Sequence, residues 1–179
     1  MEYYTVDICG RKENLPVLEI GSDLKIAFFN LHGAQGLTEY CGKKLAERIK
    51  GSGAEVVITA ESKGLQLAHV VARELGHEFY AVARKSKKLY MQDGISATVQ
   101  SITTAGSQTL YLSKHDVDLI QGKKVAIVDD VISTGGSLLG LEKLVEQTDA
   151  EIVCKAFVLA EGEAKNRKDV TYLATIPLL

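Results

Sequence analysis

The stretch VAIVDDVISTGGSL, residues 125–138, decides the fold class. Its first four residues are all apolar, without the polar alternation of a half-exposed strand, so they predict a strand that is buried on both faces. Two carboxylates, Asp129 and Asp130, follow where we expect this strand to end. A turn rich in hydroxyl groups and glycine comes next, and it opens a helix whose apolar positions begin at Leu138.

This turn has the composition of an anion-binding helix start. Its hydroxyl groups and glycines belong to Ser133, Thr134, Gly135, Gly136 and Ser137. Backbone N–H groups at a helix N-terminus attract anions, hydroxyl groups add donors, and glycine lets a phosphate approach the backbone closely. Carboxylates beside a phosphate repel it unless sugar hydroxyls lie between them. The stretch therefore predicts a ribose 5-phosphate site, with Asp129 and Asp130 on the ribose; an ordinary N-cap turn is the alternative.

Strand and helix patterns alternate on both sides of this stretch. Apolar residues that recur every three or four positions predict helices at 37–49 and 67–75. Alternating residues at 98–102 and 109–113 predict a hairpin. The predicted buried strands are 56–60, 79–83, 125–128, 152–159 and 170–174. This order favours an α/β fold with a mainly parallel sheet flanked by helices, in which ligands bind at the carboxyl ends of the strands.

Composition excludes several other classes of protein. The chain has 179 residues, of which 46% are hydrophobic and 25% charged, the balance of a single globular domain. A net charge of −2 argues against a nucleic-acid partner. No apolar run reaches the ~20 residues of a membrane span, and the N-terminus lacks a signal-peptide pattern. Cys9, Cys41 and Cys154 are far apart and odd in number, which favours reduced thiols in a cytoplasmic protein.

Residues 125–138 resemble the phosphoribosyl pyrophosphate (PRPP) motif of the type I phosphoribosyltransferases. The similarity runs from about residue 24 to residue 159 and is nearest to the adenine and xanthine enzymes. It implies the type I phosphoribosyltransferase fold with a small N-terminal hood, which we expect at residues 1–35, before a core at residues 36–179. It also implies a homodimer, and Mg²⁺ that is held by PRPP rather than directly by the protein.

Two further segments resemble the pyrophosphate-binding parts of these enzymes. The first is the loop of Glu61, Ser62, Lys63 and Gly64, although Lys63 stands where adenine enzymes often have arginine. The second, ARKSKKL at 83–89, resembles the start of their flexible catalytic loop. The pyrophosphate ligands expected from it are Arg84, Lys85 and Lys88, and Lys85 is expected to act in catalysis with Asp129 and Asp130. A solvated run of charges is the alternative.

The base-binding residues expected from the resemblance are Phe29, Asn30 and Glu161. Residues 28–31, FFNL, resemble the Phe-Leu-Asn-His segment of bacterial xanthine enzymes, in which the asparagine faces the purine; a core position is the alternative for the aromatic rings. Glu161 stands where those enzymes carry a lysine, which favours a purine with an amino group; a solvent-facing Glu161 is the alternative. Residues 102–106, ITTAG, replace the Glu-Tyr-Gly of adenine enzymes, so the sequence follows neither branch throughout.

The expected function is purine salvage in the cytoplasm, most simply the conversion of adenine and PRPP to AMP and pyrophosphate. Xanthine or another purine is the alternative substrate. A non-catalytic, PRPP-binding purine regulator is the alternative class of protein. Such regulators carry a DNA-binding domain before this core, and about two dozen residues precede the resemblance here, too few for a winged helix. We therefore expect an enzyme, with small-molecule substrates and no nucleic-acid or membrane partner.

Overall fold

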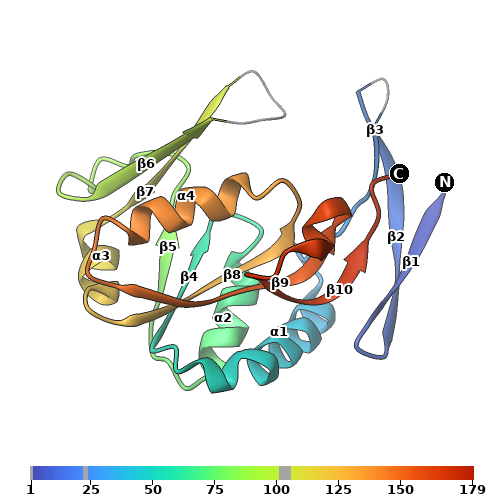
Figure 1. Cartoon of the computed structure of the whole chain (residues 1–179), viewed down its shortest axis with the longest axis horizontal. Coiled ribbons are helices and arrows are strands. Elements are labelled where there is room, and N and C mark those ends of the chain that lie inside the picture. Colours follow the sequence, from blue (N-terminus) through green and yellow to red (C-terminus); the bar gives the residue numbers. More distant parts are fainter. Residues whose placement is uncertain (1, 22–23, 101–105) are drawn as a thin grey trace.

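The computed structural model describes residues 2–21, 24–100 and 106–179 (Figure 1). Five strands form the central sheet in the order β10-β9-β8-β4-β5, and every neighbouring pair is parallel. These strands are β4 (Val56–Ala60), β5 (Tyr80–Ala83), β8 (Lys124–Ile132), β9 (Glu151–Glu161) and β10 (Thr171–Ile176). The predicted parallel α/β sheet is confirmed.

Helices cover both faces of this sheet. Helices α1 (Gln35–Ile49) and α2 (Leu65–Glu74) lie on one face, while α3 (Lys114–Ile120) and α4 (Gly136–Val145) lie on the other (Figure 1). Two short 3-10 helices, η1 (Lys50–Ser52) and η2 (Gly162–Asn166), complete the helical elements of the described residues. Side chains of one strand alternate between two cores, as Val57 packs with α1 and α2 whereas Ile58 packs with α4. Among the described helices, none is long and apolar enough to cross a membrane.

Strand β8 is longer than predicted. The apolar pattern ends at Val128, but β8 continues through both aspartates to Ile132. The reason lies in its neighbour, since β9 pairs with β8 from Lys124 as far as Ile132 and so offers backbone partners beyond the apolar run. The carboxylates are therefore part of a strand rather than of the loop that follows it.

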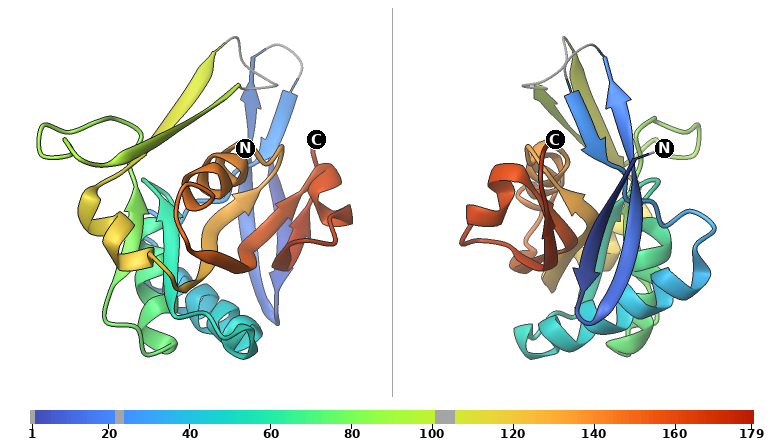
Figure 2. Two further views of the ribbon diagram at one scale, coloured as in Figure 1. Left: turned by 60° about the vertical axis from the view of Figure 1, so that its left-hand side comes forward. Right: turned by 90° about the vertical axis from the view of Figure 1, so that its right-hand side faces the viewer.

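The N-terminal residues form a separate antiparallel sheet of three strands in the order β1-β2-β3. These are β1 (Tyr3–Ile8), β2 (Arg11–Ile20) and β3 (Leu24–Ala27), and they stand beside β10 and α1 (Figure 2). The C-terminal end joins this hood, because Leu179 and Lys25 exchange backbone hydrogen bonds of 3.2 and 3.3 Å. The division of the chain at residue 35 stays a prediction.

A two-stranded hairpin, β6 (Ile95–Gln100) and β7 (Ser107–Leu112), stands above α4 (Figure 1). It confirms the predicted hairpin with strands that begin two or three residues earlier. Residues 101–105, and with them most of the ITTAG segment, lie outside the described residues. Arg84 and Tyr111 exchange two backbone hydrogen bonds of 2.8 Å, so β7 is attached to the end of β5.

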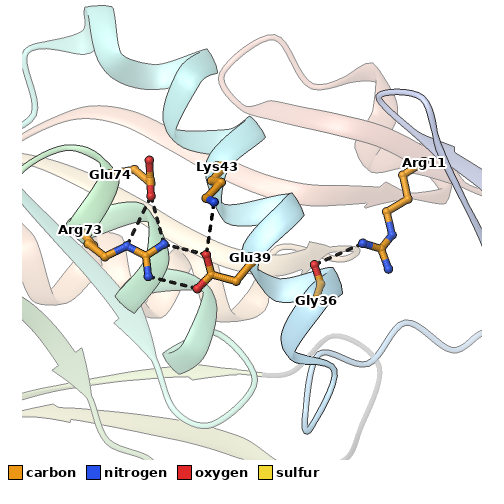
Figure 3. A network of polar contacts seen from close by, with 6 residues as sticks. All are labelled: Arg11, Gly36, Glu39, Lys43, Arg73 and Glu74. Atoms are coloured by element: carbon orange, nitrogen blue, oxygen red, sulfur yellow. Dashed lines mark hydrogen bonds and ion pairs between the residues drawn. The ribbon is translucent and has the colours of Figure 1, made fainter.

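A surface network ties α1 to α2 (Figure 3). The guanidinium of Arg73 donates to both carboxylate oxygens of Glu39, at 3.1 and 2.7 Å, and also pairs with Glu74. Lys43 lies 3.8 Å from Glu39, and Arg11 of β2 donates to the carbonyl of Gly36 at 3.2 Å. These contacts connect the start of α1 with both α2 and the hood.

Candidate active site

The parallel strands bring most of the predicted site residues to one edge of the sheet. Ala60, at the end of β4, lies opposite Ala83, at the end of β5, and β4 also pairs with β8. The loops that begin at Glu61 and Arg84 therefore meet the aspartates of β8. This edge is where ligands bind in parallel α/β sheets.

Asp129 and Asp130 have different surroundings. Asp129 lines a cavity of about 320 Å³ on the face of the sheet that carries α4. Asp130 is not part of that lining; it is 5% exposed, and its Oδ2 lies 3.8 Å from Nζ of Lys63. Successive residues of a strand point to opposite faces, which accounts for the difference. That both carboxylates hold the ribose stays a prediction.

Burial, and after it the charge of Asp130, raises the pKa of Asp129, while the charge of Lys85 opposes the rise. Two polar atoms at this edge, Oδ2 of Asp130 and Oγ1 of Thr59, are buried and form no hydrogen bond with the described residues. Buried polar groups without partners cost free energy. An arrangement of this kind suits a ligand that brings hydroxyl groups or cations, and it is typical of functional sites.

Residues 133–137, which we call the phosphate turn, line the same cavity as Asp129. Gly135 precedes α4 with a φ of 85°, in the left-handed region that favours glycine. No described side chain caps α4, so the N–H groups of its first turn face the cavity side without a side-chain acceptor. The structure thus brings together every residue predicted for the ribose 5-phosphate except Asp130.

The loop after β4 packs tightly against the aspartates. A Cβ atom built on Gly64 would lie 2.1 Å from Oγ1 of Thr59 and 2.8 Å from Oδ1 of Asp129. Only glycine fits at this position without a shift of its neighbours. The peptide bond between Glu61 and Ser62 in the same loop is cis.

Glu61 organises the next loop rather than standing as a free anion. Its carboxylate accepts hydrogen bonds of 2.7 Å from Nε of Arg84 and from the backbone N–H of Lys85. Burial acts to raise the pKa of Glu61, but these two donors and the charge of Lys88 hold it below its usual value. Arg84 also donates to the hydroxyl of Tyr90 at 3.0 Å. The predicted pyrophosphate residues Glu61, Arg84, Lys85 and Lys88 therefore lie together.

We call residues 84–88 the cation loop. Its lysines have no ion pair with a described carboxylate, and the Lys85 side chain is exposed. Lys63 approaches from the loop after β4, where its Nζ lies 5.0 Å from the centre of the Phe28 ring. Lys63 therefore lies beside Asp130, while Arg84 and the backbone of Lys85 contact Glu61.

The three predicted base-binding residues have different surroundings. Phe29 is 2% exposed and packs in the core with α1 and α2, so its ring is not available to a ligand. The ring of Phe28 is half-buried and faces Lys63. Phe28 therefore replaces Phe29 as the candidate for an aromatic contact with the base. The Asn30 side chain accepts from the N–H of His32 at 3.1 Å. Glu161, half-buried at the end of β9, makes no ion pair with another described residue.

The structure also adds residues that the sequence analysis missed. Gln100 and Gln108 of the hairpin line the cavity with Asp129, and Thr59 lies under Gly64. The one available signal was the polar Thr59 within an otherwise apolar strand. Arg167 approaches Gly135 from beyond η2, and nothing in its local sequence indicates this.

Comparison with known proteins places this site in a family. Residues 30–176 match the phosphoribosyl transferase domain. The chain is 30% identical over 132 residues, 74% of each chain, to the adenine phosphoribosyltransferase of Brachyspira hyodysenteriae. It is 37% identical over 144 residues to the xanthine phosphoribosyltransferase of Bacillus mycoides, covering 79% of this chain and 72% of the relative.

The fold agrees with these matches. The structure of adenine phosphoribosyltransferase from Saccharomyces cerevisiae, which holds adenine and an imino-altritol bisphosphate, superimposes with a TM-score of 0.68. The two are 26% identical, and the match covers 92% of this chain and 94% of that one. The phosphate turn, the carboxylate pair and the parallel sheet all lie within the matched residues. The chain therefore belongs to the phosphoribosyl transferase family, in the purine branch of the type I enzymes.

Proposed function

We propose that this protein is an adenine phosphoribosyltransferase, which converts adenine and PRPP to AMP and pyrophosphate. One observation carries the proposal. Asp129 and the whole phosphate turn line a single cavity at the carboxyl edge of the sheet, and cations stand at the ends of the neighbouring strands. A ribose 5-phosphate that carries a pyrophosphate group on C1 matches this arrangement.

The proposed reaction is a displacement at C1 of the ribose. A ring nitrogen of the purine forms a bond to C1 and releases its proton to water, while the bond from C1 to the pyrophosphate oxygen breaks and pyrophosphate leaves with the electron pair. In this proposal Asp129 holds ribose hydroxyl groups and favours the positive charge that develops on the sugar. Lys63, Arg84, Lys85 and Lys88 are proposed to hold the leaving group.

Magnesium enters this proposal with PRPP. The described residues contain no group of three His, Cys, Asp or Glu side chains that could hold a metal ion. They do offer Oδ2 of Asp130, a buried oxygen that forms no hydrogen bond with the described residues and lies 3.8 Å from Lys63, as a ligand suited to a hydrated cation. Asp130 would hold the ion through its water ligands, and when bound the ion would neutralise charge on the departing pyrophosphate.

Glu161 supports adenine over xanthine. A carboxylate at the end of β9 accepts hydrogen bonds and repels anions, and adenine offers an amino group and no carbonyl. Xanthine presents carbonyl oxygens, for which a carboxylate is the wrong partner. The second candidate is xanthine, because a relative that is 37% identical bears the name of the xanthine enzyme. We expect at least tenfold preference for adenine, equivalent to about 1.4 kcal/mol.

Turnover of adenine, hypoxanthine, guanine and xanthine at fixed PRPP and Mg²⁺ tests this proposal. The variant Glu161→Lys should narrow the preference for adenine or invert it. Its matched control is Glu163→Lys, the same change of charge two residues away on an exposed side chain that bonds to Asn166. A wild-type preference for xanthine, or an unchanged ranking in Glu161→Lys, would contradict a role of Glu161 in selecting the base. Absence of turnover with all four bases would favour the regulator.

The homodimer and the cytoplasmic location implied by the resemblance stay predictions. Sedimentation equilibrium measures the first, and fractionation of the source cells measures the second. A monomer at micromolar concentration would contradict the expected assembly.

A further inference from the structure

Arg167 lies against the phosphate turn although it is 32 positions further along the chain. It follows η2, and its side chain is 33% exposed. A Cβ atom built on Gly135 would lie 2.7 Å from Nη1 of Arg167. The guanidinium therefore fills the space that the missing side chain of Gly135 leaves, at the residue whose φ of 85° turns the chain into α4.

Asp169 holds this guanidinium in place. Nε of Arg167 donates to Oδ1 of Asp169 at 2.9 Å, and Nη2 donates to Oδ2 at 2.6 Å. A two-point pair of this kind fixes the plane of the guanidinium as well as its position. The hydrogen bonds from Arg167 also hold the pKa of Asp169 well below its ordinary value, so the carboxylate stays charged. Nη1, which makes neither of these bonds, is the nitrogen next to Gly135.

The same carboxylate connects to α4 through a second cation. Lys155 of β9 lies 3.4 Å from Oδ2 of Asp169 and also forms an ion pair with Glu142 of α4. The Lys155 and Glu142 side chains are only 22% and 17% exposed, so solvent screens this pair less than a surface pair. Arg167, Asp169, Lys155 and Glu142 thus form a chain of ion pairs that contacts Gly135, the residue before α4, and contacts the helix again at Glu142.

We propose that Arg167 is a positioning residue for the phosphate turn, which keeps Gly135 in its left-handed conformation. Arg167 acts through Gly135, because Arg167 itself is not among the residues that line the cavity. The proposal rests on the proposed function, since it takes the turn as the 5′-phosphate site. An isolated surface ion pair contributes little to stability. The pair of Arg167 and Asp169 differs because it directs Nη1 of Arg167 toward Gly135 of the phosphate turn. A shift of Gly135 would move the backbone N–H groups that we expect to bind the phosphate.

Calorimetric titration of two separate probes, ribose 5-phosphate and pyrophosphate, tests this role. We expect Arg167→Met to weaken the binding of ribose 5-phosphate about tenfold and to leave pyrophosphate binding within twofold of the wild type. Lys168→Met removes the same charge from the next, exposed residue and should leave both affinities within twofold. A general loss of structure would weaken both probes, so the difference between them separates positioning from stability.

The outcomes separate a failure of the Arg167 role from a failure of the proposed function. Equal ribose 5-phosphate affinities in the wild type and Arg167→Met, or an equal loss in Lys168→Met, would overturn the role of Arg167 and leave the proposed function standing. A wild type that binds no ribose 5-phosphate would overturn both. Should Arg167→Met fail to fold, Asp169→Asn keeps the guanidinium but weakens its fixation, and we expect about threefold weaker ribose 5-phosphate binding. An unchanged affinity in that variant would overturn the inference.

Discussion

The two anion sites proposed for PRPP are built in opposite ways. The phosphate turn consists of backbone N–H groups and short hydroxyl side chains at the start of a helix that is packed on the sheet. The pyrophosphate site consists of long cationic side chains, of which Lys85 is exposed. A preorganised backbone site binds with little loss of conformational entropy, whereas long side chains become ordered only when the ligand arrives. We therefore expect the phosphate turn to determine affinity and the cation loop to act mainly on the leaving group.

The largest effect is expected from the cation loop. Lys85→Ala/Lys88→Ala should lower kcat about 100-fold and raise the KM for PRPP less than threefold, because charge on the leaving group develops in the transition state. Lys87→Ala, in the same loop but outside the predicted site, is the control. Steady-state kinetics with adenine measures both constants. If the double variant left turnover unchanged, the loop would be a solvated run of charges rather than a part of the active site.

The carboxylates should act on affinity instead. Asp130→Asn removes a buried charge next to Lys63, and we expect PRPP binding to weaken tenfold or more, since hydrogen bonds to charged groups contribute about 1.5–3 kcal/mol. Calorimetry with Mg²⁺ and PRPP measures the change, and circular dichroism checks that the fold survives. An unchanged affinity for PRPP would show that the Asp130 carboxylate contacts neither the ribose nor the Mg²⁺ that is bound with PRPP.

The smallest expected effect concerns the stability of the phosphate turn. Gly135→Ala should destabilise the protein by roughly 1–2 kcal/mol, because its φ of 85° is unfavourable for alanine and the added Cβ would lie 2.7 Å from Nη1 of Arg167. Gly136→Ala is the matched control, since its Cβ would meet only Oγ1 of Thr134, at 4.0 Å. Urea unfolding compares the two. Equal losses of stability would mean that the left-handed turn and the Arg167 contact are unimportant.

Local sequence predicted that the residues of the phosphate turn lie together, but it did not predict which aromatic ring is accessible on the base side. The turn and its strand lie within fourteen consecutive residues, so composition and order alone indicate an anion site. The burial of Phe29 depends on how the hood packs on α1 and α2, which no local pattern records. Phe28 and Phe29 are equally apolar, and only the tertiary structure shows which ring faces Lys63.

Contacts between distant elements were also beyond the sequence analysis. The extension of β8 to Ile132 depends on pairing with β9, and the short α3 has too few turns to show a clear apolar period. Arg167 and Asp169 look like ordinary surface charges until η2 and the start of α4 are placed side by side. Such pairs become predictable only when the fold is known.

In the proposed enzyme the phosphate turn and the cation loop are two separate anion sites in one PRPP pocket. Calorimetric titration of ribose 5-phosphate into wild-type protein, with and without saturating Mg²⁺ and pyrophosphate, tests this separation most directly. We predict that one ribose 5-phosphate binds per chain in both cases, with affinities within about threefold of each other, equivalent to roughly 0.6 kcal/mol. Competitive displacement of ribose 5-phosphate by pyrophosphate would contradict the account, because it would mean that both anions occupy the same site.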